Sequence, residues 1–428
     1  MASWPGLTHI NAMASTSGYD ARMNRRVLVA GGGIGGLACA LALCRTGVPV
    51  TVLEQAESFG EVGAGVQLGP NAVRVLAQWG LTDALQSCAA FPDALRVRDA
   101  SGGRVLGQLR LGPAALARYG MPYATVHRAD LHAMLLGAVR SRTPAELVLN
   151  ARLQDMAPSA SGVSVALESG QTLMGGALVG CDGVWSRVRA ALLGDAPAMP
   201  TGHLAYRGLV PTRDLPVGLR TPVVTAWLGP RLHVVHYPVR RGEAFNVVVV
   251  VQAALREAAL GPVDPRGWYH EAGHAELRAL LGPAHPELLG MIEAVPAWSL
   301  WTLNDREPMA SPAEHARGRV ALLGDAAHPM RPYLAQGAAM ALEDAWTLGR
   351  LVDRHTQPID WTSVFERYAA LRWRRNARVQ AQSRRNGDIF HATGFLRWGR
   401  NSAMALLRER LLDNPWLYSG PPSPQALS

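Results

Sequence analysis

The chain has 428 residues, of which 48% are apolar and 18% charged, so it is long enough for two or three domains with buried cores. Its net charge of +9 at pH 7 favours anionic ligands. No helix-turn-helix, zinc-finger or RNA-binding signature accompanies that charge, which argues against a nucleic-acid partner. No apolar run reaches the roughly 18 residues that a membrane-spanning helix needs.

The first residues and the cysteines indicate the cellular setting. Residues 1–23 are polar and lack the charged and apolar regions of a signal peptide, so we expect a disordered tail. Cys39, Cys44, Cys88 and Cys181 have no metal-ligand spacing, which predicts free thiols and no metal site. Free thiols suit a reducing, cytoplasmic location.

The stretch 26–55 has the pattern of a dinucleotide-binding βαβ unit. An apolar strand at 27–30 leads through closely spaced glycines to a helix at 37–45, and a second strand at 48–53 ends at Glu54. In such units glycines allow the tight turn, the approach of a pyrophosphate and close helix packing, and an acid about 20 residues later binds a ribose. The pattern does not separate FAD from NAD. It assigns cofactor binding to Gly31, Gly33, Gly35, Gly36, Glu54 and Gln55.

The remaining periodicity predicts an α/β fold with a Rossmann-like domain, a second mixed-sheet domain and C-terminal helices. The cofactor domain is expected at 24–200 and 299–358, the substrate domain at 201–298 and the helical segment at 359–428. We expect a hairpin at 95–111, a helix at 71–79 and another from Asp130 to Val139. Strands at 147–149, 163–167 and 173–179 are predicted to form one three-stranded unit, and a helix is predicted at 265–281.

Two aspartates follow predicted strands at a ligand-binding sheet edge. Asp182 lies in Gly180-Cys181-Asp182-Gly183, and Asp325 lies in Gly324-Asp325-Ala326-Ala327-His328-Pro329. Open α/β sheets bind ligands at the carboxyl ends of their strands, so Asp325 suits a ribityl or ribose hydroxyl. Asp182 is expected to fix the loop geometry. Taken alone, each is equally typical of an aspartate that caps a turn.

With these three motifs in this order, the chain resembles the class A flavoprotein aromatic monooxygenases over 26–391. The stretches VGAGVQLGPNAVRVL, HRADL and PYLAQGAAMALEDAW resemble the hydroxybenzoate branch, with its 3-hydroxybenzoate 6-hydroxylases and salicylate hydroxylases. The resemblance implies non-covalent FAD, NADH or NADPH as a transient co-substrate, and oxygen transfer from dioxygen to a phenolic aromatic acid. Conversion of 3-hydroxybenzoate to gentisate is favoured. The alternatives are decarboxylative salicylate hydroxylation and hydroxylation of another aromatic or heteroaromatic acid.

The resemblance also implies roles for individual residues. Glu54 would bind the adenosine ribose, Arg128 the flavin side of the cofactor, and Asp325 the ribityl chain. His233 and Tyr237 share one face of a strand and would contact the substrate, with His233 as the proton acceptor. For His233, the alternative of a histidine that is hydrogen-bonded within the sheet stays open. For Arg128, the alternative is an ordinary surface arginine. The other implied cofactor contacts are Val66, Pro332, Gln336, Gly337 and Ala338. The other implied substrate contacts are Arg207 and Pro332. For Arg207, the alternative of an internal ion pair stays open.

The segment 361–412 is helical in pattern and rich in arginine. Phe390, Phe395 and Trp398 lie among the arginines, which is compatible with a homodimer or lipid-contacting face. A solvated basic face is the alternative interpretation.

Overall fold

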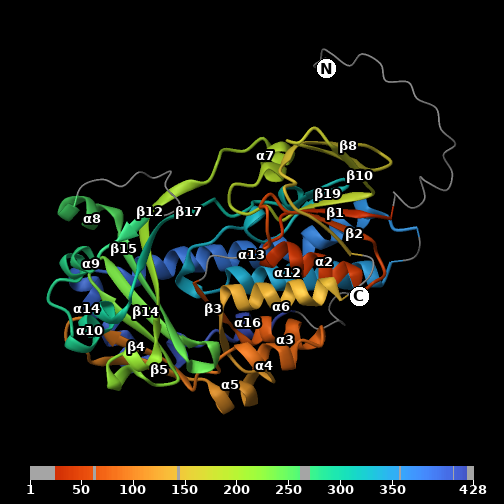
Figure 1. Cartoon of the computed structure of the whole chain (residues 1–428). Helices are drawn as coiled ribbons and strands as arrows, with labels where there is room; N and C mark the ends of the chain where they lie inside the picture. The colour runs from red at the N-terminus through yellow and green to blue at the C-terminus, as the bar shows by residue number, and fades with distance from the viewer. Residues whose placement is uncertain are drawn as a thin grey trace.

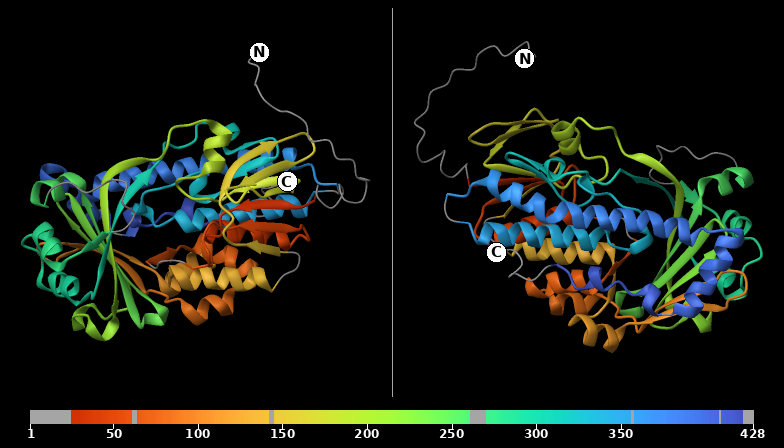
Figure 2. Two further views of the ribbon diagram at one scale, coloured as in Figure 1. Left: turned by 45° about the horizontal axis from the view of Figure 1, so that its top comes forward. Right: turned by 180° about the vertical axis from the view of Figure 1, so that it is seen from behind.

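The computed structural model describes residues 25–60, 64–141, 145–260, 270–355, 358–407 and 409–421. Two large sheets lie in opposite halves of the molecule, and helix α13 (Trp361–Phe390) runs from one half to the other (Figures 1 and 2). The tail expected at 1–23 lies outside the described residues. Among the described residues, no helix is long and apolar enough to cross a membrane.

The first sheet carries the predicted βαβ unit. Its order among the described strands is β18-β19-β11-β1-β2-β7. The strands β7, β2, β1, β11 and β19 run parallel, and β18 joins the edge antiparallel. Their bounds are β1 Val27–Ala30, β2 Val50–Leu53, β7 Ala145–Val148, β11 Ala177–Gly180, β18 Ala316–Arg317 and β19 Val320–Leu322.

Both faces of this sheet are covered, which explains why β1 is apolar at every position. Val27 and Val29 belong to the core that includes helices α2 (Ile34–Cys44) and α12 (Gly337–Asp353). Leu28 belongs to a second core with residues of a small antiparallel sheet on the opposite face. Alternate side chains of one strand therefore anchor two layers.

The small sheet corrects one prediction. It consists of β8 (Leu153–Pro158), β9 (Val163–Leu167) and β10 (Thr172–Gly175). The predicted strand at 147–149 corresponds to β7 of the first sheet instead. The predicted strand at 173–179 breaks at Gly176, so that β11 also enters the first sheet. The prediction joined strands that are close in sequence but pair with different sheets.

The second sheet has the order β16-β17-β12-β15-β14-β13-β4-β5 among the described strands. Only the β13–β4 pair of these is parallel, so the predicted mixed sheet is confirmed. The hairpin predicted at 95–111 is β4 and β5 of this sheet. The bounds are β4 Ala94–Asp99, β5 Val105–Arg110, β12 Met199–Pro211, β13 Val223–Gly229, β14 Leu232–Val239, β15 Ala244–Gln252, β16 His270–Ala272 and β17 Trp298–Asp305.

Helices α9 (His274–Leu281) and α10 (Pro286–Ala294) cover one face of the second sheet, and α14 (Gly394–Leu407) and α15 (Glu409–Leu412) pack on part of the other face near β5. The apolar sides of α9 and α10 pack on Trp227, Val234 and Val247. The opposite face looks toward the first half of the molecule (Figure 1). The helix predicted at 265–281 was too long: 270–272 form β16, and 265–269 lie outside the described residues.

The bounds of the domains proposed at 200, 298 and 358 stay predictions.

The remaining elements connect and flank the sheets. These elements are β3 Gly65–Leu68, α3 Pro70–Gln78, α4 Thr82–Cys88, α5 Gly112–Tyr119, β6 Ala124–His127, α6 Arg128–Arg140, α7 Arg187–Leu193, η1 Thr212–Asp214, η2 Val217–Leu219, η3 Arg240–Gly242, α8 Ala253–Leu260, α11 Pro312–His315, η4 Gly324–Ala326, η5 Pro332–Leu334, α14 Gly394–Leu407, α15 Glu409–Leu412 and α16 Pro415–Tyr418.

Candidate active site

A cavity of about 330 Å³ lies between the first sheet and the face of the second sheet that is opposite α9 and α10. It is lined by the glycine turn after β1, strands β3, β12, β14 and β15, the segment η4–η5 and the start of α12. Segments distant in sequence therefore converge on one space. The predicted site residues that line it are Gly33, Gly35, Val66, Arg128, Arg207, His233, Tyr237, Asp325, Pro332, Gln336, Gly337 and Ala338.

The glycine turn beside the cavity has no room for side chains. Gly31 has a φ of +103°, and a Cβ there would lie 2.5 Å from the carbonyl oxygen of Cys181. A Cβ on Gly36 would collide with the carbonyl oxygen of Gly31. Glu54 accepts a hydrogen bond of 2.7 Å from the amide of Gly32, which ties the end of β2 to the turn. Gln55 is exposed beyond it.

The start of α12 forms another wall of the cavity. The amides of the first helical turn have no partner within a helix, and the helix dipole adds positive potential there. Gln336 is the N-cap, and its side chain makes no capping bond. Its side chain is buried, and Nε2 has no hydrogen-bond partner. Asp325 is exposed on η4 at the same cavity. This edge can therefore donate hydrogen bonds to a polar, electron-rich ring.

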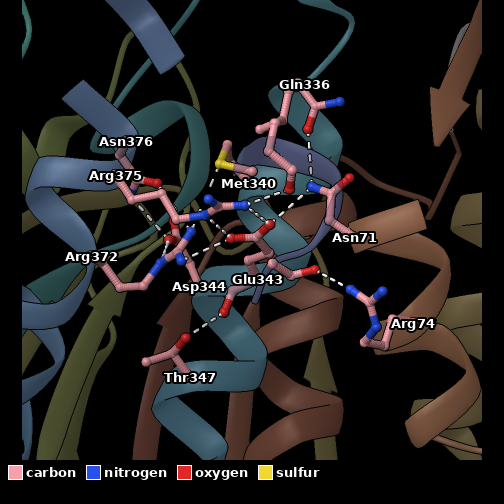
Figure 3. Close-up of polar contacts among 12 residues, drawn as sticks. Asn71, Arg74, Gln336, Met340, Glu343, Asp344, Thr347, Arg372, Arg375 and Asn376 are labelled. Carbon is pink, nitrogen blue, oxygen red and sulfur yellow. Dashed lines mark hydrogen bonds and ion pairs between the residues drawn. The ribbon is translucent and has the colours of Figure 1, made fainter. Parts of the chain in front are cut away.

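A buried ionic cluster fixes α12 in place (Figure 3). Arg372 of α13 binds Glu343 at 2.9 Å and Asp344 at 2.7 Å, and all three side chains are buried. Burial alone would raise the pKa of Glu343, but the charges of Arg372 and Arg375 lower it below its ordinary value. Asn71 donates to both Glu343 and Gln336, at 2.9 and 3.0 Å. The cluster thus reaches from α13 to the cavity wall.

This cluster corrects the interpretation of the C-terminal arginines as one solvated basic face. Arg372 and Arg375 neutralise acids of α12. Arg384 binds Asp305 at 3.2 Å, and it also binds Glu307. These three arginines of α13 are therefore paired with acids of other segments.

Asp182 has the loop role that the sequence predicted. Its carboxylate accepts from the hydroxyl of Ser186 at 2.5 Å and from the amides of Arg187 and Val188 at 2.7 and 3.1 Å. These bonds shape the turn into α7, and burial is the main reason that the pKa of Asp182 is raised.

Strand β14 presents alternate residues to the cavity. His233, Val235 and Tyr237 line it, whereas His236 lies on the opposite face near Trp227 and Phe245. Burial, followed by the charge of His203, lowers the pKa of His233 to about 3. His233 is therefore neutral before a ligand binds. Burial also raises the pKa of Tyr237 well above its usual value, against an opposing effect from Arg207.

Arg207 of β12 brings a positive charge to the same cavity. Its guanidinium lies 5.4 Å from the ring centre of Trp301, and its Nε is buried without a hydrogen-bond partner. Among the residues that the structure describes, Arg207 forms no ion pair with an acid. Burial, followed by the charge of Arg128, lowers its pKa. The internal ion pair considered for Arg207 is thus not found, and an anionic ligand would supply the missing partner.

Comparison with known proteins decides the family. Residues 24–383 match the family model described as an FAD binding domain. The chain belongs to this family. It is 40% identical to the 3-hydroxybenzoate 6-hydroxylase of Polaromonas naphthalenivorans (strain CJ2), over 92% of this chain and 95% of that protein. It is 37% identical to the enzyme of the same name from Klebsiella oxytoca, over 88% of this chain and 91% of the relative.

Solved structures agree with the family. A salicylate hydroxylase substrate complex is 27% identical and has a TM-score of 0.78, with 95% of this chain and 97% of that chain covered. Klebsiella pneumoniae HpxO complexed with FAD and uric acid is 25% identical with a TM-score of 0.80, covering 94% and 98% of the two chains. The protein is therefore an FAD-dependent monooxygenase of the aromatic hydroxylase family, with NAD(P)H as co-substrate.

The residues present fit FAD. The glycine turn excludes side chains where a pyrophosphate would pass, and the unpartnered Nε2 of Gln336 offers a donor beside the helix start. Two residues near the site were not predicted from the sequence. Asn71 orients Gln336, and His391 contacts His233 at 2.8 Å. Neither residue lies in a motif that indicates this contact, because both contacts join segments far apart in the chain.

Proposed function

We propose that the protein hydroxylates 3-hydroxybenzoate to gentisate, with bound FAD, NADH or NADPH, and dioxygen. The observation that carries the proposal is the half-buried Arg207, which has no acidic partner among the described residues, in a cavity shared with His233 and Tyr237. A carboxylate would neutralise the arginine, and a phenolic hydroxyl could then face the histidine. The names of the similar proteins support the same substrate.

The chain's own residues would bind the substrate and assist its deprotonation. Arg207 would hold the carboxylate, and the positive potential of Arg207 and Arg128 would lower the pKa of the phenol. His233 would accept the phenolic proton, and Tyr237 would orient the ring. Bound FAD would supply the redox and oxygen-transfer chemistry. Loss of the phenolic proton makes the ring electron-rich, which suits attack by an electrophilic oxygen.

The cofactor contacts stay proposals of the same kind. The amides around Gly31 to Gly36 would receive the pyrophosphate, and Glu54 with Gln55 would lie at the adenosine ribose. Asp325 would hold the ribityl chain. Val66, Arg128, Pro332 and the segment 336–338 would contact the flavin ring system. Pro332 is exposed on η5, so it would also border the substrate.

Salicylate hydroxylation with loss of the carboxyl group is the second candidate, because the salicylate hydroxylase complex shares the fold over nearly its whole length. A panel of 2-, 3- and 4-hydroxybenzoate and 6-hydroxynicotinate separates the candidates. We expect 3-hydroxybenzoate to stimulate NADH oxidation most and to yield gentisate. Release of catechol from 2-hydroxybenzoate as the fastest reaction would contradict the proposal.

We also propose a homodimer through the C-terminal helices and a cytoplasmic location. The face of α14 exposes Phe395 at 95%, Trp398 at 73% and Leu406 at 82% of their surface, which is unusual for large apolar side chains. The four cysteines are free, which suits a reducing compartment. Sedimentation of the wild-type protein and of a Phe395→Glu variant tests the dimer: the proposal predicts a dimer that the variant loses.

A further inference from the structure

Three imidazoles lie together on the substrate side of the cavity. His233 lines the cavity on β14, His391 caps the C-terminal end of α13, and His203 lies on β12; all three are buried. The Nδ1 of His233 lies 2.8 Å from the Nε2 of His391. The ring centres of His203 and His391 are 4.9 Å apart. His233 therefore has a direct polar partner that the sequence did not reveal.

The pair is held from several sides. The amide of His391 donates to the carbonyl of Gly387 at 3.1 Å, and its own carbonyl accepts from the amide of Arg231, in the turn before β14, at 3.2 Å. The rings of Tyr333 and Phe390 lie 5.3 and 5.4 Å from the ring of His233. The last turn of α13 is thus anchored to the strand that carries His233, and the contact between the two imidazoles is fixed by both elements.

The contact determines what the other nitrogen of His233 can do. A neutral imidazole has one N–H, so two arrangements fit the 2.8 Å contact. If His391 donates, the N–H of His233 is on Nε2, and Nε2 cannot accept a proton. If His233 donates through Nδ1, its Nε2 carries a lone pair and is the ring nitrogen left for a ligand. Only the second arrangement makes His233 a base.

We propose that His391 is a positioning residue that accepts the Nδ1 proton of His233 and so presents the Nε2 lone pair of His233 to the substrate phenol. This inference rests on the proposed hydroxylase function. In the step, the phenolic O–H bond breaks and an N–H bond forms at Nε2 of His233. The resulting imidazolium shares its Nδ1 proton with Nε2 of His391, which spreads the positive charge over two rings and fixes the ring plane.

The surrounding charges explain why a partner is needed. Burial, the other two histidines and Arg400 all lower the pKa of His391. Burial, followed by the charge of Arg331, lowers the pKa of His203, and Asp388 and Asp305 oppose this shift. The cluster is therefore neutral before substrate binds, and an isolated His233 would be a weak base. A hydrogen bond that strengthens when His233 is charged favours the protonated form.

The test measures the pKa of a bound phenol rather than turnover. The holoenzyme with oxidised flavin is titrated with 3-hydroxy-4-nitrobenzoate, whose phenolate has its own visible absorbance, at a series of pH values. We expect the wild-type enzyme to lower the phenol pKa relative to free ligand. His391→Leu should raise the bound pKa by about one unit, a tenfold smaller phenolate-to-phenol ratio at a given pH. His391→Gln places an acceptor near the position of Nε2 and should restore the ratio to within about twofold.

His236→Phe is the matched control, because His236 is buried on the opposite face of the same strand and does not line the cavity. It should leave the bound pKa unchanged. If His391→Leu does not retain flavin, His391→Asn replaces it, since its shorter side chain does not reach His233. If the bound probe has the same pKa in the wild type, in His391→Leu or His391→Asn, and in His391→Gln, the role of His391 is overturned. The role of His233 is not affected by that result. A wild-type enzyme that binds the probe without lowering its pKa overturns the proposed base, and His391 with it.

Discussion

Replacing Arg207 by methionine tests the substrate site most sharply. The change removes a positive charge that has no acidic partner among the described residues but keeps an unbranched side chain. Loss of one partner from a buried charge pair typically costs 2–5 kcal/mol. Taking about 3 kcal/mol, we expect the dissociation constant of 3-hydroxybenzoate to rise about 150-fold. A phenol without a carboxylate should bind wild type and variant about equally.

The same substitution should not weaken the ligand-free fold. Burial lowers the pKa of Arg207, which means that the folded state disfavours its charged form. The methionine variant should therefore have an equal or higher melting temperature. Arg98→Met is the control, since Arg98 binds Glu287 at 2.8 Å and lies 4.1 Å above the ring centre of Trp227. That variant should melt at a lower temperature and bind substrate normally.

The assay combines flavin absorbance changes on ligand titration with thermal unfolding of the holoenzyme, with and without 3-hydroxybenzoate. The Arg207 variant should lose the shift that substrate adds to the melting temperature. A variant that unfolds several degrees lower without ligand and still binds 3-hydroxybenzoate as wild type does would refute the reasoning, because Arg207 would then be a structural residue.

Three further outcomes follow from the site and from the cluster beneath it. Asp325→Ala should lose FAD during purification, measured as the flavin-to-protein absorbance ratio; retained stoichiometric flavin would contradict the ribityl contact. His233→Ala should keep FAD yet form at least tenfold less product per NADH oxidised, and unchanged coupling would remove its role. Arg372→Met should destabilise the fold by about 3–5 kcal/mol, because it leaves Glu343 and Asp344 buried with fewer partners. Since the folded pKa of Glu343 lies below its ordinary 4.5, this pairing stabilises the fold above about pH 4.5 and is lost as the pH falls. Denaturant titrations should show that the free energy of unfolding falls with decreasing pH in the wild type and falls less in Arg372→Met. Identical pH profiles would exclude the cluster as the source of this loss of stability.

The local patterns of the sequence were sufficient for several parts of the site. The glycine turn depends on local backbone geometry: Gly31 has a positive φ, and a Cβ on Gly36 would collide with the carbonyl oxygen of Gly31, five positions away. The shared face of His233 and Tyr237 follows from the two-residue period of one strand, and both residues line the cavity. These features are determined by neighbours within a few positions.

Features that depend on distant partners could not be predicted. The three-stranded unit was wrong because β7 and β11 pair with strands of the first sheet, and sequence proximity does not indicate that choice. The alternative of a solvated face stayed open for the arginines of α13 because their acidic partners lie on α12, at the end of β17 or just beyond it. His391 lies 158 positions from His233, so their contact exists only in the folded chain.

Product analysis under ¹⁸O₂ tests the central claim most directly. Purified holoenzyme is supplied with 3-hydroxybenzoate, NADH and labelled dioxygen, and the product is identified by mass spectrometry and by comparison with authentic standards. We predict gentisate that carries one ¹⁸O atom and retains its carboxyl group. NADH oxidation that yields only peroxide, or a product that has lost the carboxyl group, would contradict the assignment of this cavity to 3-hydroxybenzoate hydroxylation.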